Sequence, residues 1–385
     1  MSATDPRPRL SRHEFFEESR DPHSGPALSR RKGQHLSICL DADTYQVETS
    51  ETRFSEVHLL HRALPEINAA DVDTSTIFLG SSIAMPVFIS SMTGGSEGAY
   101  QVNKDLAAAA QELGIPVGMG SIRILFRKPD VIEHFLLKRY APNVPVFANI
   151  GGVQLPELAH DEIYRMIERL EVDAIAVHLN PGQELAQPGG DVNFAGIFDE
   201  IRRFAAGSPV PVIVKETGFG IDPATVVHLL EGGATYVDIA GAGGTNWNRV
   251  ESYRHEDPAI GAAVQEFDDW GIPTALILGA LGRNQRGVLA SGGIRSGMDV
   301  LKAVALGAEA AGLALPFVRA VTDGGVPAAV AAGRQLQYVI RTGMALTGCT
   351  VLSGLREAPI WTDESFRLDS AAIRRAAGSN EEYDG

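Results

Sequence analysis

The chain has 385 residues, of which 44% are hydrophobic and 21% charged, and its formal net charge is −15. These are ordinary values for a globular protein, and so acidic a chain is unsuited to general nucleic-acid binding. No apolar run reaches the ~18 residues of a membrane span, and the polar N-terminus of mixed charge does not resemble a signal peptide. Cys39 and Cys349 form neither a metal motif nor a disulfide framework, so we expect a cytoplasmic protein with reduced thiols.

Short apolar runs rich in β-branched residues alternate with helix-like segments along the chain. The expected strands span residues 86–91, 116–120, 144–149, 173–179, 210–216, 236–240, 287–291 and 310–314. The expected helices span residues 99–113, 129–140, 156–170, 194–204, 223–231 and 298–306. Eight such units predict an α/β fold, a (β/α)8 TIM barrel. A doubly wound dinucleotide-binding sheet does not fit, because no Gly-x-Gly-x-x-Gly follows the first strand.

Composition divides the chain into three parts. Residues 1–28, rich in Pro, Ser, Arg and Glu, are expected to form a flexible N-terminal arm. Residues 29–370 are expected to form a single barrel domain, and residues 371–385 a flexible tail. Residues 29–85 precede the barrel and are expected to cap its rim or floor. The connection 246–286 between the sixth and seventh strands is longer than a usual loop, so we expect it to hold helix and a functional lid.

Polar or glycine-rich clusters follow seven of the eight expected strands, at the end where a barrel carries its active site. They are residues 91–95, 120–123, 149–152, 178–184, 215–220, 241–245 and 291–295. The glycines of 241–245 and 291–295 predict a phosphate site. N–H groups of such loops, and the N-terminus of the helix near Met298, can converge on an anion. The alternative is that these glycines only turn the chain.

Charged and polar side chains at the other strand ends suggest further ligand contacts. Lys215 ends an apolar strand and could place positive charge beside a flavin ring, form a Schiff base, or sit in a structural ion pair. Glu184, with amide neighbours, suits Mg²⁺, which takes few protein ligands; the alternative is a solvated loop acid. His178 could bind a substrate oxygen or be a core histidine.

A basic cluster, Arg31-Lys32-Gly33-Gln34-His35, precedes the barrel. In an acidic protein such a local concentration of positive charge and donors suggests an anion such as a diphosphate. A plain surface basic patch is the alternative.

Taken in order, these motifs resemble the type 2, FMN-dependent isopentenyl-diphosphate delta-isomerases. The resemblance covers residues 30–355 and is most specific in His178-Leu179-Asn180-Pro181-x-Gln183-Glu184 and Lys215-Glu216-x-Gly218-Phe219-Gly220. It implies an isomerase that interconverts isopentenyl and dimethylallyl diphosphate with reduced FMN and Mg²⁺, NADPH being the reductant. It also implies that the partner is a small-molecule isoprenoid diphosphate and that the protein binds neither a membrane nor a nucleic acid. The oligomer that it implies is a homotetramer or homo-octamer.

The resemblance further implies a set of site residues. FMN would be held by Ser91, Met92, Thr93, Ser121, Asn149, Lys215, Thr245, Gly293, Arg295, Ala314 and Leu315. The substrate would be held by Arg31, Lys32, His35, Arg123, Asn180 and Gln183. Gln183, Glu184 and His178 would be catalytic, and Glu184 would bind Mg²⁺.

The chain departs from the family pattern at four positions. Ile122 stands where Gln is usual, and Gln34 stands where an acid is usual. Gly182 replaces a bulkier apolar residue, and Ala240 occupies a position that is often Ser. Ile122 is expected near the flavin edge or substrate, so a divergent paralogue acting on a related isoprenoid diphosphate is the first alternative.

Two other classes of barrel enzyme lack a required residue here. A 2-hydroxy-acid oxidase would need a histidine near Arg295, and an inosine-monophosphate dehydrogenase would need a loop cysteine after strand six; neither is present. A non-catalytic flavoprotein is the alternative from another class.

Overall fold

The computed structural model describes residues 27–91 and 97–378, with side chains from residue 33 onward apart from residues 92–98. Eight parallel strands form one sheet, in the order β10-β9-β8-β7-β6-β5-β4-β11. Its strands are β4 (Val87–Ile89), β5 (Val117–Ser121), β6 (Val146–Gly151), β7 (Ala174–His178), β8 (Val212–Lys215), β9 (Tyr236–Asp238), β10 (Val288–Leu289) and β11 (Ala311–Leu313). The parallel bridge between Ala290 and Ala311 joins the two edges, so the sheet closes. The predicted barrel and all eight strands are confirmed.

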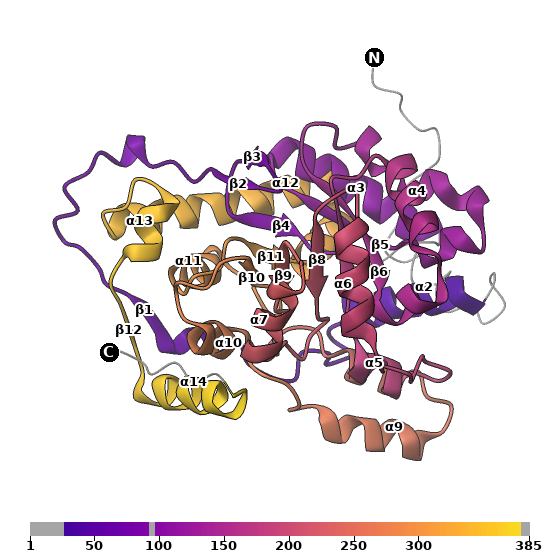
Figure 1. Cartoon of the computed structure of the whole chain (residues 1–385). Coiled ribbons are helices and arrows are strands. Elements are labelled where there is room, and N and C mark those ends of the chain that lie inside the picture. The colour runs from indigo at the N-terminus through magenta and orange to yellow at the C-terminus, as the bar shows by residue number, and fades with distance from the viewer. Residues whose placement is uncertain (1–26, 92–96, 379–385) are drawn as a thin grey trace.

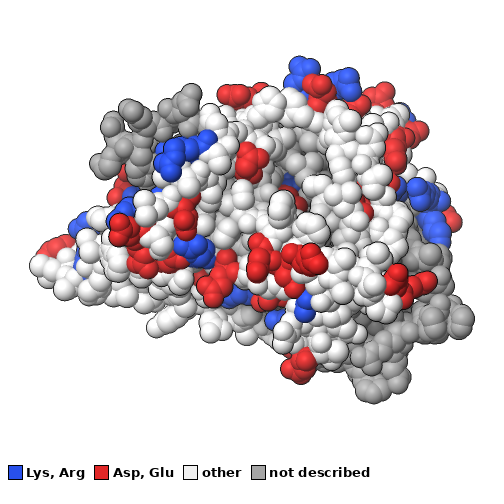
Figure 2. Space-filling view, turned by 90° about the horizontal axis from the view of Figure 1, so that it is seen from below, with Lys and Arg blue, Asp and Glu red and all other residues white. Residues whose placement is uncertain are grey.

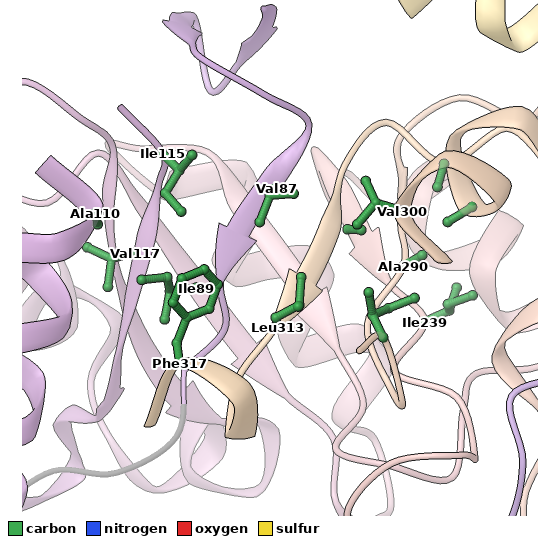
Figure 3. Packing of buried hydrophobic residues seen from close by; sticks show 14 of the residues in the cluster. Val87, Ile89, Ala110, Ile115, Val117, Ile239, Ala290, Val300, Leu313 and Phe317 are labelled. Atoms are coloured by element: carbon green, nitrogen blue, oxygen red, sulfur yellow. The ribbon is translucent and has the colours of Figure 1, made fainter. Parts of the chain in front are cut away.

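Successive side chains of a strand point to opposite faces of the sheet, so the barrel has one apolar layer outside the sheet and another inside it. Outward side chains such as Val87, Ile89 and Leu313 pack with helix residues such as Phe317 and Val300 in the main core, as Figure 3 shows. Inward side chains form a second cluster, which contains Phe88, Phe147, Ile213 and Leu289. The hairpin of β2 (Thr76–Phe78) and β3 (Ser81–Ile83) adds Phe78 and Ile83 to that inner cluster. The expectation that part of residues 29–85 caps the barrel floor is therefore confirmed.

Helices surround the sheet (Figure 1). They are α3 (Glu97–Leu113), α4 (His160–Leu170), α6 (Ile197–Gly207), α7 (Pro223–Glu231), α10 (Thr274–Leu281), α11 (Gly297–Ala305) and α12 (Leu315–Leu346). Helix α12 is kinked at Gly324 and Gly325, where the dihedral angles are not helical.

The predicted helix over 129–140 is wrong. The segment forms two 3-10 turns, η4 (Pro129–Phe135) and η5 (Leu137–Arg139), which follow the turn η3 (Ile122–Phe126). Phe135 and Leu137 are both fully buried. Residues two apart do not share a face of an α-helix, so the break at Leu136 lets both side chains reach the core.

Residues 246–286 contain α8 (Trp247–Ser252), α9 (Pro258–Val264), the turn η7 (Gln265–Phe267) and the barrel helix α10. The predicted helical content of this segment is confirmed. Helix α5 (Pro181–Ala186) and turn η6 (Gly152–Glu157) cover other strand ends.

The remaining elements lie outside the barrel repeats. They are α2 (Ala27–Leu40), η1 (Phe54–Glu56), β1 (Val57–Leu59), η2 (Ala69–Asp71), α13 (Leu352–Glu357), β12 (Ile360–Thr362) and α14 (Glu364–Ala376). Strands β1 and β12 pair antiparallel. Because α14 continues to Ala376, the expected boundary at residue 370 is too early. No helix in residues 27–91 and 97–378 is long and apolar enough to span a membrane.

Candidate active site

A cavity lies at the carboxyl ends of the barrel strands. The inner positions two residues beyond the apolar cluster become polar: Ser90 follows Phe88, Asn149 follows Phe147, and Lys215 follows Ile213. All three polar side chains line the cavity. Figure 2 views the molecule from the side on which α5 and α9 lie, and its surface is hollowed near the centre, with acidic and basic side chains around the hollow.

Most of the predicted site residues line this one cavity. They are His35, Ser91, Ser121, Arg123, Asn149, His178, Asn180, Gln183, Glu184, Lys215, Thr245, Gly293, Arg295, Ala314 and Leu315. Met92 and Thr93 lie outside the described residues. Arg31 and Lys32 belong to helix α2, but their side chains are outside the described part.

The Glu184 carboxylate is buried and held on both oxygens. Its Oε1 accepts a hydrogen bond from Asn180 Nδ2 (3.1 Å), and its Oε2 accepts from Gln187 Nε2 (3.4 Å) and from the main-chain N–H of Asp191 (2.9 Å). All three donors are uncharged. These bonds hold the carboxylate at a fixed position on the cavity wall, and the alternative of Glu184 as a solvated loop acid is wrong.

A buried carboxylate that the sequence analysis did not single out lies beside Gln183. Glu251, on α8, is completely buried; its Oε1 accepts from Gln183 Nε2 (3.3 Å) and lies 2.8 Å from His35 Nε2, while its Oε2 accepts from Arg254. Burial alone would raise the pKa of Glu251, but His35 and Arg254 outweigh it and hold that pKa below its usual range. Glu251 follows Trp247 by four residues, so both share one face of α8, and Trp247 also lines the cavity.

Arg123 enters the cavity from turn η3 with two acidic partners. Its NH1 donates to Asp191 Oδ2 (3.0 Å), and its NH2 lies 3.5 Å from Glu157 Oε2. Gln154 Nε2 also donates to Asp191 Oδ2 (3.4 Å). On another side of the cavity, His178 Nδ1 lies 2.7 Å from Asn149 Oδ1, so His178 is held by a neighbouring strand end.

Lys215 is buried, and its ammonium donates to the main-chain oxygen of Glu216. It lies opposite Asp238 in the sheet. Burial raises the pKa of the Asp238 carboxyl, and the charge of Lys215 opposes that rise. Asp238 in turn accepts hydrogen bonds from the N–H and hydroxyl of Ser291 (3.0 and 2.9 Å).

Glu216 has a structural role that the sequence analysis missed. Its carboxylate accepts from the N–H groups of Gly218, Phe219 and Gly220, and so holds the loop after β8. Burial nevertheless raises the pKa of Glu216 above its ordinary value.

The glycine-rich loops after β9 and β10 touch through their backbones. A methyl group on Gly292 would lie 2.0 Å from the oxygen of Gly241, and one on Gly293 would lie 2.4 Å from the oxygen of Gly243. Gly293 also has a φ of 77°, which favours glycine. These glycines therefore do more than turn the chain: they bring two loops together, and Gly292 and Gly293 line the cavity.

The start of α11 is capped by its own side chains. Ser296 Oγ accepts from the N–H of Asp299, and the Asp299 carboxylate accepts from the N–H groups of Arg295 and Ser296. This capping box satisfies the N–H groups of Arg295, Ser296 and Asp299. The start of α12 also lines the cavity, through Ala314 and Leu315. The Arg295 guanidinium pairs with Glu48.

Two features fit a bound FMN. The hydroxyls of Ser90 and Ser91 are buried at the cavity and have no hydrogen-bond partner among the described residues. In the first turn of α12, Phe317 and Val318 donate to the oxygen of Ala314 and Pro316 has no N–H, which leaves the N–H of Leu315 as the donor that no helical carbonyl satisfies.

The donor set also fits Mg²⁺ that arrives with phosphate. The described ranges contain no group of three or more His, Cys, Asp or Glu side chains able to hold a metal by themselves. Mg²⁺ commonly binds through one or two carboxylates together with substrate phosphates and water. Glu184 supplies one such carboxylate.

The departures at Ile122 and Gly182 lie away from the cavity. Ile122 is fully buried in the main core, so its expected place beside the flavin or substrate is wrong. Gly182 lines a separate outer groove, and a methyl group there would lie 2.2 Å from the Phe219 ring. Ala240 does line the cavity, with a φ of 37°, and Gln34 Oε1 accepts from Arg254 Nε (3.2 Å).

A family model described as FMN-dependent dehydrogenase matches residues 39–125 and 183–362, more than half of the chain. Solved mandelate oxidases share the fold: one with (S)-mandelic acid has a TM-score of 0.61 at 19% identity, covering 92% of this chain and 99% of that one. Another, with an FMN adduct, has a TM-score of 0.60 at 20% identity, covering 91% and 100%. Fold, cavity and matched segments define an FMN-dependent dehydrogenase-type barrel.

Curated relatives narrow this class. An isopentenyl-diphosphate delta-isomerase of Borreliella afzelii is 43% identical over 86% of this chain and 92% of its own length. Those of Methanothrix thermoacetophila and Pyrococcus abyssi are 42% and 39% identical, again over 86% of this chain and over 92% and 91% of theirs. The chain belongs to the isopentenyl-diphosphate delta-isomerase family, as its motifs predict.

Proposed function

We propose that this enzyme interconverts isopentenyl and dimethylallyl diphosphate with reduced FMN and Mg²⁺. The observation that carries the proposal is one cavity lined by two chemically different sets of groups. One set comprises Lys215, the serine hydroxyls that have no described partner, and the start of α12. Glu184, Arg123 and the histidines line the same cavity.

FMN would be held by the strand-end residues. Ser91, Ser121 and Asn149 offer hydrogen bonds, and Thr245, Gly293, Ala314 and Leu315 surround the expected phosphate end; Met92, Thr93 and Arg295 complete the set by resemblance. Lys215 would place its charge beside the ring and favour the reduced anionic form. Bound reduced FMN supplies an electron-rich ring that can exchange a proton with an alkene without net redox change, and NADPH would be the reductant.

The diphosphate would be bound by the cationic and amide side chains. Arg123 and His35 offer charge, Asn180 and Gln183 offer amides, and Arg31 and Lys32 would add charge from α2. Glu184 would hold Mg²⁺, which offsets the phosphate charge beside the acidic side chains. This binding energy orients a small apolar group that has no polar handle of its own.

The chain's residues would also control the reacting end. Gln183 is held between Asn180 and Glu251, which fixes its amide. His178 is held by Asn149. Protonating an alkene creates tertiary cationic character, which a cavity closed to water over an electron-rich ring can stabilise. Ile122 lies outside the cavity, which removes one reason for favouring a paralogue with a different substrate.

The test is an anaerobic assay of FMN-loaded protein with isopentenyl diphosphate. Fully reduced enzyme with Mg²⁺ should form dimethylallyl diphosphate, whereas oxidised enzyme, or reduced enzyme with EDTA, should not. A control with 2-hydroxy acids should leave oxidised flavin unreduced. Reduced, FMN-loaded enzyme that makes no product would refute the isomerase, and flavin reduction by a hydroxy acid would favour an oxidase. Sedimentation analysis of the same sample tests the predicted homotetramer or homo-octamer.

A further inference from the structure

Asp191 touches two parts of the site at once. Its carboxylate accepts from Arg123 NH1 (3.0 Å), and its main-chain N–H donates to Glu184 Oε2 (2.9 Å). Arg123 is the arginine expected to bind diphosphate, and Glu184 is the expected metal carboxylate. One residue therefore joins the two groups that must act together on a metal-bound diphosphate.

Two glycines make this double contact possible. Gly189 has a φ of 69°, and a methyl group on Gly190 would lie 2.0 Å from the oxygen of Glu184. Any larger residue at 190 would push the loop away from α5. The loop thus lies directly against the main chain of Glu184, which brings Asp191 to the carboxylate.

Asp191 also has the stronger hold on Arg123. The second acidic partner, Glu157, lies farther away at 3.5 Å and its side chain is 52% exposed, whereas Asp191 is 30% exposed. Gln154 donates to the same Asp191 oxygen, so the carboxylate is itself fixed. An arginine side chain has many rotamers, and a hydrogen-bonded carboxylate removes much of that freedom before a ligand arrives.

We propose that Asp191 is a positioning residue that presets Arg123 for the diphosphate and couples it to Glu184. The inference rests on the proposed function for the identity of the ligand. Asp191 acts through Arg123 and not on the reacting carbons. Its loss should therefore weaken diphosphate binding and leave the chemical step nearly unchanged.

The test uses FMN-loaded protein and two readouts. Asp191→Asn keeps the N–H to Glu184 and removes the charge. KM for isopentenyl diphosphate and Kd for inorganic diphosphate with Mg²⁺, measured by calorimetry, should each rise about 10-fold, which is 1.4 kcal/mol. The value of kcat should stay within about twofold. Asp191→Glu keeps the negative charge, so its affinity for diphosphate should lie between those of Asp191→Asn and the wild type. This variant also keeps the test possible if Asp191→Asn folds poorly.

A double-mutant cycle separates positioning from a general loop effect. In an Arg123→Gln background, Asp191→Asn should not change the diphosphate Kd further. The matched control is Asp268→Asn, which removes the carboxylate partner of Arg249 (2.8 Å) elsewhere in the chain, at similar burial. That variant should bind diphosphate like the wild type.

Three outcomes would overturn the inference: unchanged or tighter diphosphate binding in Asp191→Asn, an additive loss in the double variant, or an equal loss in Asp268→Asn. Failure of the proposed function looks different. In that case the wild-type enzyme itself would form no dimethylallyl diphosphate, whereas failure of the inference alone leaves wild-type turnover intact.

Discussion

Glu251 Oε1 lies 2.8 Å from Nε2 of His35 and thereby joins α8 to α2. The same carboxylate accepts from Gln183, so α5 is tied to this contact as well. Three elements that are far apart in the chain thus meet at one buried charge beside the cavity.

Replacing Glu251 with Gln should destabilise the protein by about 3 kcal/mol near neutral pH, because it leaves the largely buried Arg254 guanidinium without its carboxylate partner. Urea denaturation of both proteins measures this difference. The control is Glu112→Gln, which removes an exposed partner of Arg334 and should change stability by less than about 1 kcal/mol. Equal effects of the two substitutions would contradict the role of burial.

The effect of Glu251 should depend on pH with a defined sign. The folded-state pKa of Glu251 is lowered from the ordinary 4.5. Its stabilising contribution is therefore complete above about pH 4.5 and is lost as the pH falls through the lowered value. The difference between wild type and Glu251→Gln should shrink below that pH. A difference that grows on acidification would show that the pKa is raised instead.

Glu184→Gln should lower Mg²⁺-dependent turnover by roughly 10–100-fold, because the substitution removes the only charge that this residue offers to the metal. A titration of activity with Mg²⁺ should show a weaker midpoint. The flavin absorbance of the variant should match that of the wild type. Loss of bound FMN would show that Glu184 contacts the flavin and not the metal.

Replacing Lys215 with Gln should make reduction of the bound flavin harder. Losing a charged hydrogen-bond donor beside the ring costs about 1.5–3 kcal/mol, roughly 30–60 mV for two electrons. Equilibration with a reference dye measures the potential. Lys302→Gln is the control, since that partly buried lysine donates to the Phe54 oxygen (2.7 Å) away from the cavity and should leave the potential unchanged.

Gly293→Ala should destabilise the protein by about 2–4 kcal/mol and weaken FMN binding. The added methyl meets the oxygen of Gly243 at 2.4 Å, and the φ of 77° is unfavourable for alanine. Gly196→Ala is a matched control, because its φ is 75° but nothing lies within 4 Å of an added methyl. It should cost about 1 kcal/mol, with FMN binding intact. Thermal unfolding and FMN titration test both variants.

Ile122→Gln introduces the residue usual in the family, yet it should not improve turnover. The side chain is fully buried in the core, so an amide there lacks a partner and should cost about 2 kcal/mol. Steady-state kinetics should give KM and kcat within about twofold of the wild type. A clear gain in kcat would place the side chain at the cavity after all.

The sequence by itself determined that the fold is a barrel, where its eight strands lie, and which end of the barrel carries the cavity. Strand positions follow from short apolar runs between helical segments, and these are local patterns. The glycine-rich clusters and Lys215 could be placed at strand ends for the same reason, because carboxyl ends of parallel strands meet at one face. The lining of the cavity by Glu184 and Arg123 followed from this one rule.

Only the tertiary structure decided how side chains at the cavity are aimed and paired. The register between β5 and β6 shifts between Gly118 and Ser121, which puts one extra residue on β5 and breaks the simple alternation before Ile122. Ile122 therefore enters the core, which no count along the strand reveals. The contacts of Glu251 with His35, and of Asp191 with Arg123, join residues from different elements. Such contacts depend on how whole elements pack against one another. Local sequence determines where a strand begins and ends, but not which side chains of other elements lie beside it.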